Sequence, residues 1–523
     1  MPIQPPPFKI LCLAPFHPDP ERIWQGPPLP VDRFNIDEVI DQLQIRFFLP
    51  LDQHLCPAGG IALRFDTLKS MHPDGLAKSN AYLSRLLQLK EYLKNARRQG
   101  VGAARIREEL RQWPDMPPIA ILEDRPAGKA AAAAGALDNL LSMVDLPGSP
   151  STPAEAIRDE VHQIDVIVQQ ILDTVFRNPG FSQMERAWGG LRLLLQQSTS
   201  QADSRVSAAA MQADSMEQSL ESLTAHVIND LPNVVLLDLP FDHSPLAMQR
   251  LSAAAQWAAT LMVPMVAWVP VDFFQIQSWR QLTTLPFLPH HLDTPLYAKF
   301  SKLKASDEGQ WLCLTCNRIL ARFPYGKDNP PRQVVFKENE KPWISPVWAL
   351  GALITQSAEQ TGWPTRFTDI QQFQLLNLAL HTPDDSDPAA TEVLLARDRL
   401  DQLSRAGFTP LSSEQGRDLA FCPKAVTING NSLAFQLLLS LTTQFILWCK
   451  DHLPAQLGPD ELRHQLEEAL RQFSARSKPP GFEKIAVSTD VANPEGRIPV
   501  HFVLTPHPSV LPGNQVIELR MDW

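Results

Sequence analysis

The stretch Asn233-Val234-Val235-Leu236-Leu237-Asp238 begins the pattern that decides the fold. Its unbroken apolar run is typical of a strand that is buried on both faces. An alanine-rich helix is expected from residue 246 to 260, and a second apolar strand from residue 263 to 269. A strand, a helix and a strand in this order form a βαβ unit, with parallel neighbouring strands and helices packed on the sheet. The sequence therefore predicts a mixed α/β fold.

Further elements of both kinds flank this unit. Apolar residues recur along one side of residues 161–176, which predicts a helix. Near the C-terminus, residues 499–504 and 515–521 predict two strands, and a weaker strand is expected at 484–488. Strands at a chain end, after a Pro/Gly-rich connection, form an arm that could complete the sheet of another chain. The polar residues 196–222 give no clear element.

The first part of the chain forms a separate block. Strands are expected at its start and around residues 45–49 and 61–65, followed by one long helix over 74–98. Prolines and alanines then indicate a linker that contains one short amphipathic segment. We therefore expect four parts, with boundaries at 1–112 (domain), 113–155 (linker), 156–477 (core) and 478–523 (β-strand arm).

Composition excludes several classes of function. The formal net charge is -10 and no run of lysine and arginine stands out, which argues against nucleic acid as a partner. The first residues lack the basic start and apolar run of a signal peptide, and the longest apolar stretches are too short to cross a bilayer. We therefore expect a cytoplasmic protein that does not insert into a membrane.

No catalytic signature is present in the sequence. Phosphate-binding, dinucleotide-binding, nucleophile-elbow and zinc-protease motifs are all missing, so we expect no enzyme activity and no cofactor. Cys313 and Cys316 form a lone C-x-x-C on an expected strand, where buried structural cysteines are favoured over a redox or metal pair. His290 and His291 beside Asp293 are interpreted as a solvated loop rather than a metal site.

Two motifs in the second block point to a known family. The first motif is segment 178–192, which contains Phe181, Glu185, Trp188 and Leu191. The second motif is segment 318–326, which contains Arg318, Arg322, Pro324, Tyr325 and Gly326. Together with segments 347–351, 406–411 and 504–507, they resemble the large subunit of the type VI secretion contractile sheath, TssC or VipB. The resemblance covers residues 156–523 and implies that the motif residues form part of the family's core.

The first block resembles the small subunit of the same sheath, TssB or VipA. The similar segments are 7–11, 31–39, 65–68 and 72–74. The chain therefore resembles a natural fusion of both subunits. It departs from the family at Ala14-Pro15-Phe16, and the strand expected after the first motif of the large subunit is not evident in residues 196–222. These departures indicate a divergent member.

The resemblance implies a protomer that polymerises around an Hcp-type inner tube and ejects the tube by contraction. Its implied partners are further copies of itself, the tube protein and baseplate proteins. In this family the terminal strands are exchanged between protomers. The side chains that would lie in exchanged strands here are Val500, Phe502, Leu504, Val516, Ile517 and Leu519.

The amphipathic segment in the linker has two interpretations. It lies where the family's large subunit is bound by a ClpV-type disassembly ATPase, so the resemblance implies a recognition helix. Its apolar side chains are Leu137, Leu140, Leu141 and Val144. The alternative is a strap on the surface of this chain itself.

A second function also stays open for the whole chain. It could be a non-contractile adaptor, cap or baseplate component that keeps the fold of the sheath but does not polymerise by itself. Polymerisation of the purified chain separates the two functions.

Overall fold

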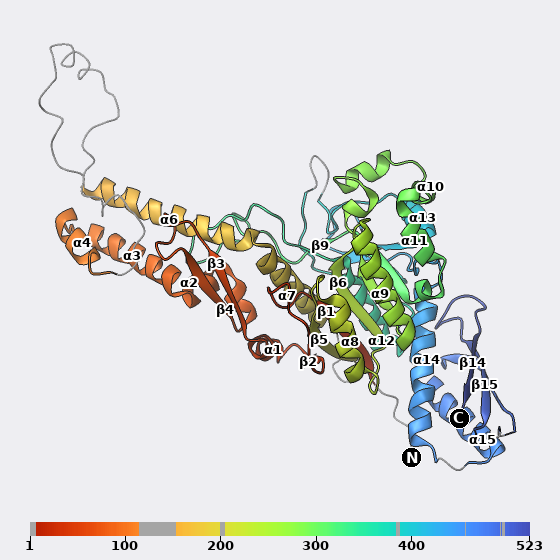
Figure 1. The fold of residues 1–523 in the computed structure, drawn as a ribbon. Helices are drawn as coiled ribbons and strands as arrows, with labels where there is room; N and C mark the ends of the chain where they lie inside the picture. The colour runs from red at the N-terminus through yellow and green to blue at the C-terminus, as the bar shows by residue number, and fades with distance from the viewer. Residues whose placement is uncertain are drawn as a thin grey trace, which may run out of the picture. The chain divides into compact units, whose positions relative to one another are not determined.

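The structure is a computed structural model that describes residues 7–113, 153–198, 204–382, 388–454, 457–491, 493 and 497–523 (Figure 1). The chain forms two compact units, each built from segments that are far apart in the sequence. The larger unit contains Met1–Val39, Gln183–Phe323 and Lys341–Trp523, and the smaller unit contains Ile40–Ser182 and Pro324–Glu340. Both units combine helices and strands, which confirms the predicted mixed α/β class.

The larger unit contains most of the strands. They are β1 (Phe8–Ala14), β2 (Leu29–Val31), β5 (Ser204–Ala210), β6 (Val234–Pro240), β7 (Met265–Trp268), β8 (Leu312–Cys316), β9 (Ile319–Leu320), β10 (Trp343–Ile344), β11 (Phe408–Pro410), β12 (Ser412–Ser413), β13 (Ala420–Phe421), β14 (Phe482–Thr489), β15 (Pro499–Pro506) and β16 (Ile517–Asp522). Its helices are α7 (Pro179–Gln197, from residue 183), α8 (Met216–Val227), α9 (Pro245–Leu261), α10 (Leu288–Leu292), α11 (Ala298–Lys304), α12 (Pro346–Thr361), α13 (Arg397–Ala406), α14 (Leu433–His452) and α15 (Pro459–Ser474). Short 3-10 helices lie at Val271–Phe274, Trp279–Thr284, Pro295–Tyr297 and Asp307–Trp311.

A seven-stranded sheet organises the larger unit. Among the described residues its strand order is β11-β8-β7-β6-β1-β5-β2. The βαβ unit predicted from residues 233–269 is present as β6, α9 and β7, with β6 and β7 parallel. β1 pairs in parallel with β5 on one side and with β6 on the other, so the first strand of the chain lies inside the sheet (Figure 1). The edge strand β2 is antiparallel to β5.

The strand β5 corrects the sequence analysis. Residues 196–222 gave no clear element, yet β5 runs from Ser204 to Ala210 and pairs with β1 at seven successive positions. Its serines and alanines have little strand propensity of their own. The parallel ladder with β1 and the burial of Ala208–Ala210 hold this segment in the sheet, so tertiary contacts override local preference.

One face of the sheet is covered by α12, which packs along β5, β6, β7 and β8. Trp348 of α12 and Trp188 of α7 are both fully buried there. The ring of Phe16, which follows β1, lies 4.7 Å from Trp188 and 6.1 Å from Trp348 between ring centroids. These three aromatic side chains join α7, α12 and the carboxyl end of β1 in one hydrophobic core.

The smaller unit is mainly helical. Its elements are α1 (Ile36–Gln42, from residue 40), β3 (Ile45–Pro50), β4 (Gly60–Phe65), the 3-10 helix Leu68–Met71, α2 (Pro73–Ser79), α3 (Ala81–Arg98), α4 (Ala103–Leu110) and α6 (Pro153–Arg177). β3 and β4 form an antiparallel hairpin, and α3 packs along α6 (Figure 1). Lys90 of α3 forms an ion pair with Asp165 of α6. The long helix expected over 74–98 is divided at Asn80, whose Oδ1 accepts hydrogen bonds from the N–H groups of Tyr82 and Leu83.

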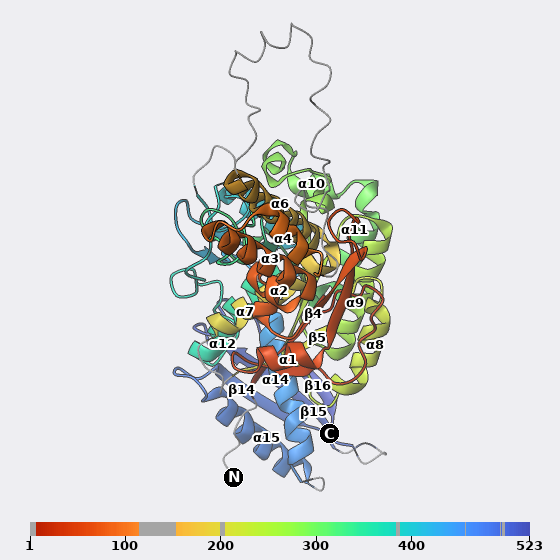
Figure 2. The same cartoon turned by 90° about the vertical axis from the view of Figure 1, so that its left-hand side faces the viewer.

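The C-terminal strands form a separate sheet in the larger unit. β14, β15 and β16 are antiparallel, with β15 in the middle, and α15 packs against β14 (Figure 2). α14 precedes them and is long and apolar enough to cross a membrane by length and composition alone. However, 61% of its most apolar window is buried inside the structure, as in the core helix of a globular protein.

The bounds of the two compact units differ from the domain boundaries expected from the sequence. β1 and β2 come from the first block but belong to the sheet of the larger unit. In the smaller unit, the carboxylate of Asp74 accepts hydrogen bonds from the backbone N–H groups of Arg332 and Gln333, at 2.8 and 2.9 Å. The sequence blocks therefore do not pack as independent bodies, because each compact unit needs residues from both.

Candidate functional site

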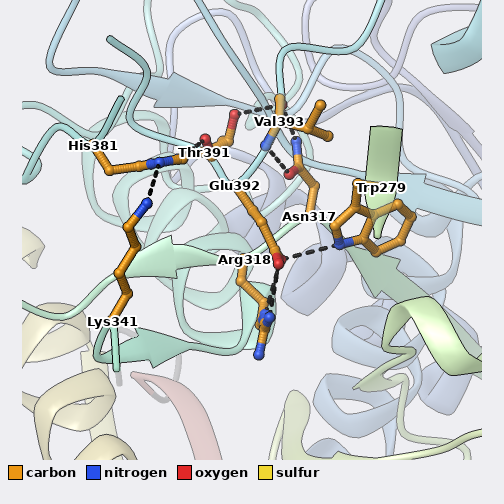
Figure 3. A network of polar contacts seen from close by, with 8 residues as sticks. All are labelled: Trp279, Asn317, Arg318, Lys341, His381, Thr391, Glu392 and Val393. Atoms are coloured by element: carbon orange, nitrogen blue, oxygen red, sulfur yellow. Dashed lines mark hydrogen bonds and ion pairs between the residues drawn. The ribbon is translucent and has the colours of Figure 1, made fainter. Parts of the chain in front are cut away.

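The second sequence motif lies beside a network of polar contacts in the larger unit (Figure 3). Arg318, just before β9, donates from Nε and Nη2 to the two carboxylate oxygens of Glu392, at 2.9 and 2.7 Å. The indole N–H of Trp279 also donates to Glu392, at 3.0 Å. The side chains of Arg318 and Glu392 are only 27% and 18% exposed. This two-point contact between arginine and carboxylate fixes both orientation and distance.

Asn317 positions the arginine. It is fully buried and adopts φ of 75°, a left-handed conformation that asparagine tolerates better than most residues. Its Nδ2 donates to the carbonyl oxygens of Val393 and Leu411, both at 2.9 Å, and its Oδ1 accepts from the N–H of Val393 at 3.1 Å. The end of β8 is thereby tied to the segment that carries Glu392.

His381 closes the other end of the network (Figure 3). Burial lowers its pKa, so the ring is neutral near pH 7 and one nitrogen donates while the other accepts. Its Nε2 lies 2.8 Å from the carbonyl oxygen of Thr391, and its Nδ1 lies 3.4 Å from Nζ of Lys341. Since the polar groups drawn in this network bond to one another, the arrangement is suited to holding loops together rather than to proton transfer on a substrate.

The substitution Glu392→Gln tests how strongly this network holds the fold. It leaves the partly buried guanidinium of Arg318 without its charged partner, and we expect unfolding free energy to fall by about 2 kcal/mol. The matched control is Glu414→Gln, which breaks the surface pair with Arg417, where the side chains are 47% and 62% exposed. That change should cost about 0.5 kcal/mol or less. Urea unfolding measures both variants, and equal losses would contradict a structural role for the network.

The first sequence motif meets the second through an ion pair. Glu185 of α7 accepts a hydrogen bond from Nε of Arg322 at 3.1 Å, and both side chains are 14% exposed. In the same helix, the indole N–H of Trp188 donates to the carbonyl oxygen of Phe16 at 3.2 Å, and Leu191 is fully buried. These motif residues therefore fasten α7 to the loop after β9 and to the end of β1.

The remaining motif residues lie in the smaller unit. Phe181 packs against Phe65 and Phe176, with ring centroids 5.4 and 5.1 Å apart. Tyr325 packs against Phe176 at 5.6 Å, and its backbone exchanges two hydrogen bonds with Glu338. Gly326 follows with φ of 152°, and Pro324 precedes the tyrosine. The nine motif residues are therefore divided between the two compact units.

The C-terminal sheet holds the residues assigned to strand exchange. Val500, Phe502 and Leu504 lie on β15, which is paired with β14 on one side and β16 on the other. Both edges of β15 are therefore paired within this chain. Ile517 is buried and Leu519 half-buried on β16, while Val516 is 41% exposed just before that strand.

The outer edges of this sheet are formed by β14 and β16, and at β16 the carbonyl oxygen of Asp522 accepts a hydrogen bond from Nζ of Lys450 at 2.7 Å. Within the described residues no further strand is bonded beyond β14 or β16. Ile498 and Trp523 exchange backbone hydrogen bonds at 3.3 and 2.9 Å, and antiparallel pairs alternate between bonded and non-bonded positions. The N–H groups of Glu518, Arg520 and Asp522 therefore point away from β15, at the open edge of β16. A strand from another chain could add at this edge.

The structure describes some of the other candidate residues from the sequence. Cys313 and Cys316 are fully buried, as expected, and burial raises the pKa of Cys313 to about 12 and that of Cys316 further. His290 and His291 lie on α10 rather than in a loop. No group of three or more potential metal ligands occurs in the part of the chain that the structure describes. Segment 137–144, with Leu137, Leu140, Leu141 and Val144, lies outside the described residues.

Several residues of these networks were not found by sequence analysis. Glu392 and Glu338 lie in irregular segments, where no periodicity marks a side chain as buried or paired. Asn317 carries a weak signal, because asparagine directly after an apolar strand often adopts a left-handed conformation. The partners of both motifs come from distant segments, so spacing along the chain could not reveal them.

Comparison with known proteins identifies the family. The family model described as EvpB/VC_A0108, tail sheath N-terminal domain (VipB), matches residues 158–231 and 232–429, just over half of the chain. The chain belongs to this family of tail sheath proteins. The model described as Type VI secretion system, VipA, VC_A0107 or Hcp2, matches residues 6–115. One polypeptide therefore joins the segments that correspond to the two sheath subunits.

Individual relatives are only distantly similar to this chain. The Type VI secretion system sheath protein TssC1 of Pseudomonas aeruginosa is 22% identical over 298 residues, which cover 51% of this chain and 60% of that protein. The chain thus spans about 60% of the length of this curated relative. A solved structure, the cryo-EM structure of the anti-feeding prophage baseplate, 6-fold symmetrised, matches 64% of this chain and 75% of its own chain at 10% identity. Its TM-score of 0.34 is too low to establish a common arrangement.

Proposed function

We propose that this chain is a structural subunit of a type VI secretion contractile sheath, in which one polypeptide supplies both sheath subunits. The observation that carries the proposal is the position of β1, a strand of the small-subunit segment, between β5 and β6 of the large-subunit segment. The two segments fold into one protomer, so the fusion fixes their ratio at one to one. The protomer polymerises in the cytoplasm around an Hcp-type tube, on a baseplate, and drives the tube out by contraction.

Strand addition at the C-terminal sheet provides the link between protomers. We assign the addition to the edge of β16, because α15 packs against β14. Main-chain hydrogen bonds to this edge would keep neighbours connected through a change in their relative orientation, because such bonds depend on the short segment that is exchanged and not on the rest of the interface.

Negative-stain electron microscopy of the purified chain, alone and with the tube protein, tests the proposal. We expect tubes or stacked rings. Only monomers or small discrete particles under both conditions would rule out self-polymerisation and support the adaptor, cap or baseplate alternative. The same grids also test the open edge with the variant Arg520→Pro, which removes an N–H that points away from β15 and no internal ladder bond.

The matched control for that variant is Arg520→Thr, which removes the same side chain but keeps the backbone N–H. We expect Arg520→Pro to abolish tubes and rings and Arg520→Thr to keep them, while both remain folded by circular dichroism. Equal assembly of the two variants would show that neighbours do not add a strand at β16.

We also propose that segment 137–144 is the recognition helix for a ClpV-type ATPase, on the basis of its place in the linker of the fused subunits. A peptide with Leu140→Ala and Leu141→Ala should lose the ATPase in a pull-down. Retention of the ATPase by the changed peptide would favour a strap on the chain's own surface.

A further inference from the structure

A polar cavity of about 1000 Å³ opens in the larger unit, apart from the networks described above. Two of its walls belong to the main sheet and its cover: the start of β1 and β5, and the end of α12 with the loop that follows. The other walls are the connection between α15 and β14 and the loop between β15 and β16. The cavity therefore lies at the junction between the main sheet and the C-terminal sheet.

Positive charge dominates the lining of this cavity. Arg205, Arg366, Arg476 and Lys478 supply four cations, against the single carboxylate of Glu359. The chain as a whole has a formal net charge of -10, so this excess is opposite in sign to the overall balance. Cations that converge on one cavity raise the local concentration of anions.

Two of the four cations are held in place by the fold. Arg366 donates from Nη1 to the carbonyl oxygen of Ser509 at 2.5 Å and from Nη2 to Asp369 at 2.8 Å. The guanidinium of Arg476 lies 5.0 Å above the ring of Trp363, a position typical of a cation–π contact. These contacts give the cavity a preformed wall, because neither cation has to be ordered when a ligand arrives.

The other two cations are open to solvent. Arg205 and Lys478 are exposed, and among the described residues neither forms an ion pair with an aspartate or glutamate. The competing carboxylate is engaged elsewhere, since Oε1 of Glu359 accepts hydrogen bonds from the hydroxyl groups of Ser198 and Ser204, both at 2.6 Å. An anion binds well where some cations are free to contact it and neighbouring cations are already held in position.

We propose that this cavity binds a small anion with at least two negative charges, carried by phosphate or carboxylate groups. Its volume is in the range that small-molecule sites occupy, roughly 300–1,000 Å³. Arg205 and Lys478 contact the ligand directly, while Arg366 and Arg476 form the positive wall behind it. The inference goes beyond the proposed assembly function and does not depend on it.

Binding would strengthen the junction between the two sheets. The structure already joins them here through the hydroxyl of Thr365, which donates to the carbonyl oxygen of Val510 at 2.5 Å, and the indole of Trp363, which donates to Ser477 at 2.6 Å. An anion that contacts Arg205 on β5 and Lys478 before β14 adds a further bridge between the same two parts. Amide hydrogen exchange of residues 476–478 should therefore slow when the anion is present.

Isothermal titration calorimetry of the full chain at low ionic strength tests this site, with inorganic pyrophosphate and citrate as probes. We expect saturable binding of at least one probe, and the preferred probe distinguishes a phosphate ligand from a carboxylate ligand. The double variant Arg205→Gln/Lys478→Gln should bind about a hundredfold more weakly, at roughly tenfold for each charge-assisted contact removed. Both side chains are exposed, so the variant is expected to stay folded.

The matched control is Lys302→Gln/Lys424→Gln, which removes the same charge from exposed positions of the same unit that do not line the cavity. This control should keep the affinity of the parent chain. Two results would overturn the proposal: no saturable binding of either probe at millimolar concentration, or equal affinity of the double variant and its control.

Discussion

A chain divided within residues 114–152 is expected to give two fragments that cannot fold separately. The fragment that begins at residue 153 lacks β1, which leaves β5 and β6 without their shared partner inside the sheet. The first fragment keeps β1 but has no sheet in which to place it. Expressed alone, each fragment should be insoluble or unfolded by circular dichroism. Expressed together, the fragments should form a soluble complex in a one-to-one ratio.

The size of the effect follows from burial. The five side chains Phe8, Ile10, Leu11, Cys12 and Leu13 of β1 are each no more than 2% exposed. At about 1.5–3 kcal/mol for a large apolar side chain, the strand contributes on the order of 10 kcal/mol. The whole free energy of unfolding of a typical protein is about 5–15 kcal/mol. Loss of this one strand is therefore enough to unfold the larger unit.

A co-expressed first fragment with Leu11→Asp is the control for this experiment. It places a charge inside the sheet and should fail to rescue the second fragment, while the unchanged first fragment succeeds. If the fragment from residue 153 folded alone, with the same thermal midpoint as the intact chain, β1 would be dispensable. The fusion would then join two independent bodies.

The position of β1 also shows where sequence analysis reaches its limit. The βαβ unit at 233–269 was predictable, because apolar runs and an alanine-rich helix are local signals. The pairing of Phe8 with Ser204 leaves no local signal, because nothing in either segment indicates a partner so far away in the sequence. The family motifs indicated that both subunits are present, but they carried no information on how the subunits interlock.

The candidate sites likewise contain residues that the sequence reveals and partners that it does not. The motif residues Arg318 and Arg322 were found by resemblance, and their acidic partners are Glu392 and Glu185. Only Glu185 was found with them, because it belongs to the other motif. The C-terminal strands were located correctly, but the sequence did not show that the weaker strand at 484–488 pairs with β15. Alternating patterns locate a strand, but they do not show which of its edges is free.

Gly190→Ala is expected to destabilise the larger unit by about 2 kcal/mol. A Cβ at residue 190 would lie 2.2 Å from Cδ1 and 2.3 Å from Nε1 of Trp348, whose side chain is fully buried. Overpacking of this kind costs about 1–3 kcal/mol. Displacing the indole also breaks its hydrogen bond to Asp238, 2.7 Å long, and such a hydrogen bond contributes about 0.5–1.5 kcal/mol. The better helix propensity of alanine offsets about 1 kcal/mol of this loss of stability.

The neighbouring glycine provides the control. A Cβ at residue 189 would lie 3.3 Å from Cβ of Ala321, so a small shift accommodates it. Gly189→Ala should therefore leave stability unchanged or raise it by up to about 1 kcal/mol through helix propensity. Urea unfolding of the two variants compares one added methyl group at adjacent positions of α7. Equal midpoints would mean that the close approach of α7 and α12 at Trp348 does not constrain the fold.

The loss caused by Gly190→Ala should also grow with pH. Burial raises the pKa of Asp238 above its ordinary value of 3.8, and the hydrogen bond from Trp348 partly offsets this shift. Below pH 3.8 the carboxyl is protonated in both states and adds no pH dependence. Above it the unfolded chain releases the proton first, so the contribution of Asp238 to stability falls as pH rises towards the folded pKa. Loss of the indole donor raises the folded pKa of Asp238 further, so the fall in stability continues to a higher pH.

The difference between the parent chain and Gly190→Ala should therefore stay constant below the folded pKa of Asp238 in the parent chain and grow as pH rises past it. A steric clash alone would cost the same at every pH, so the pH series separates overpacking from the lost contact with Asp238. Adding Asp238→Asn to both chains removes the titrating group and should make their difference independent of pH. A pH dependence that survived in the asparagine background would assign the effect to another ionisable group.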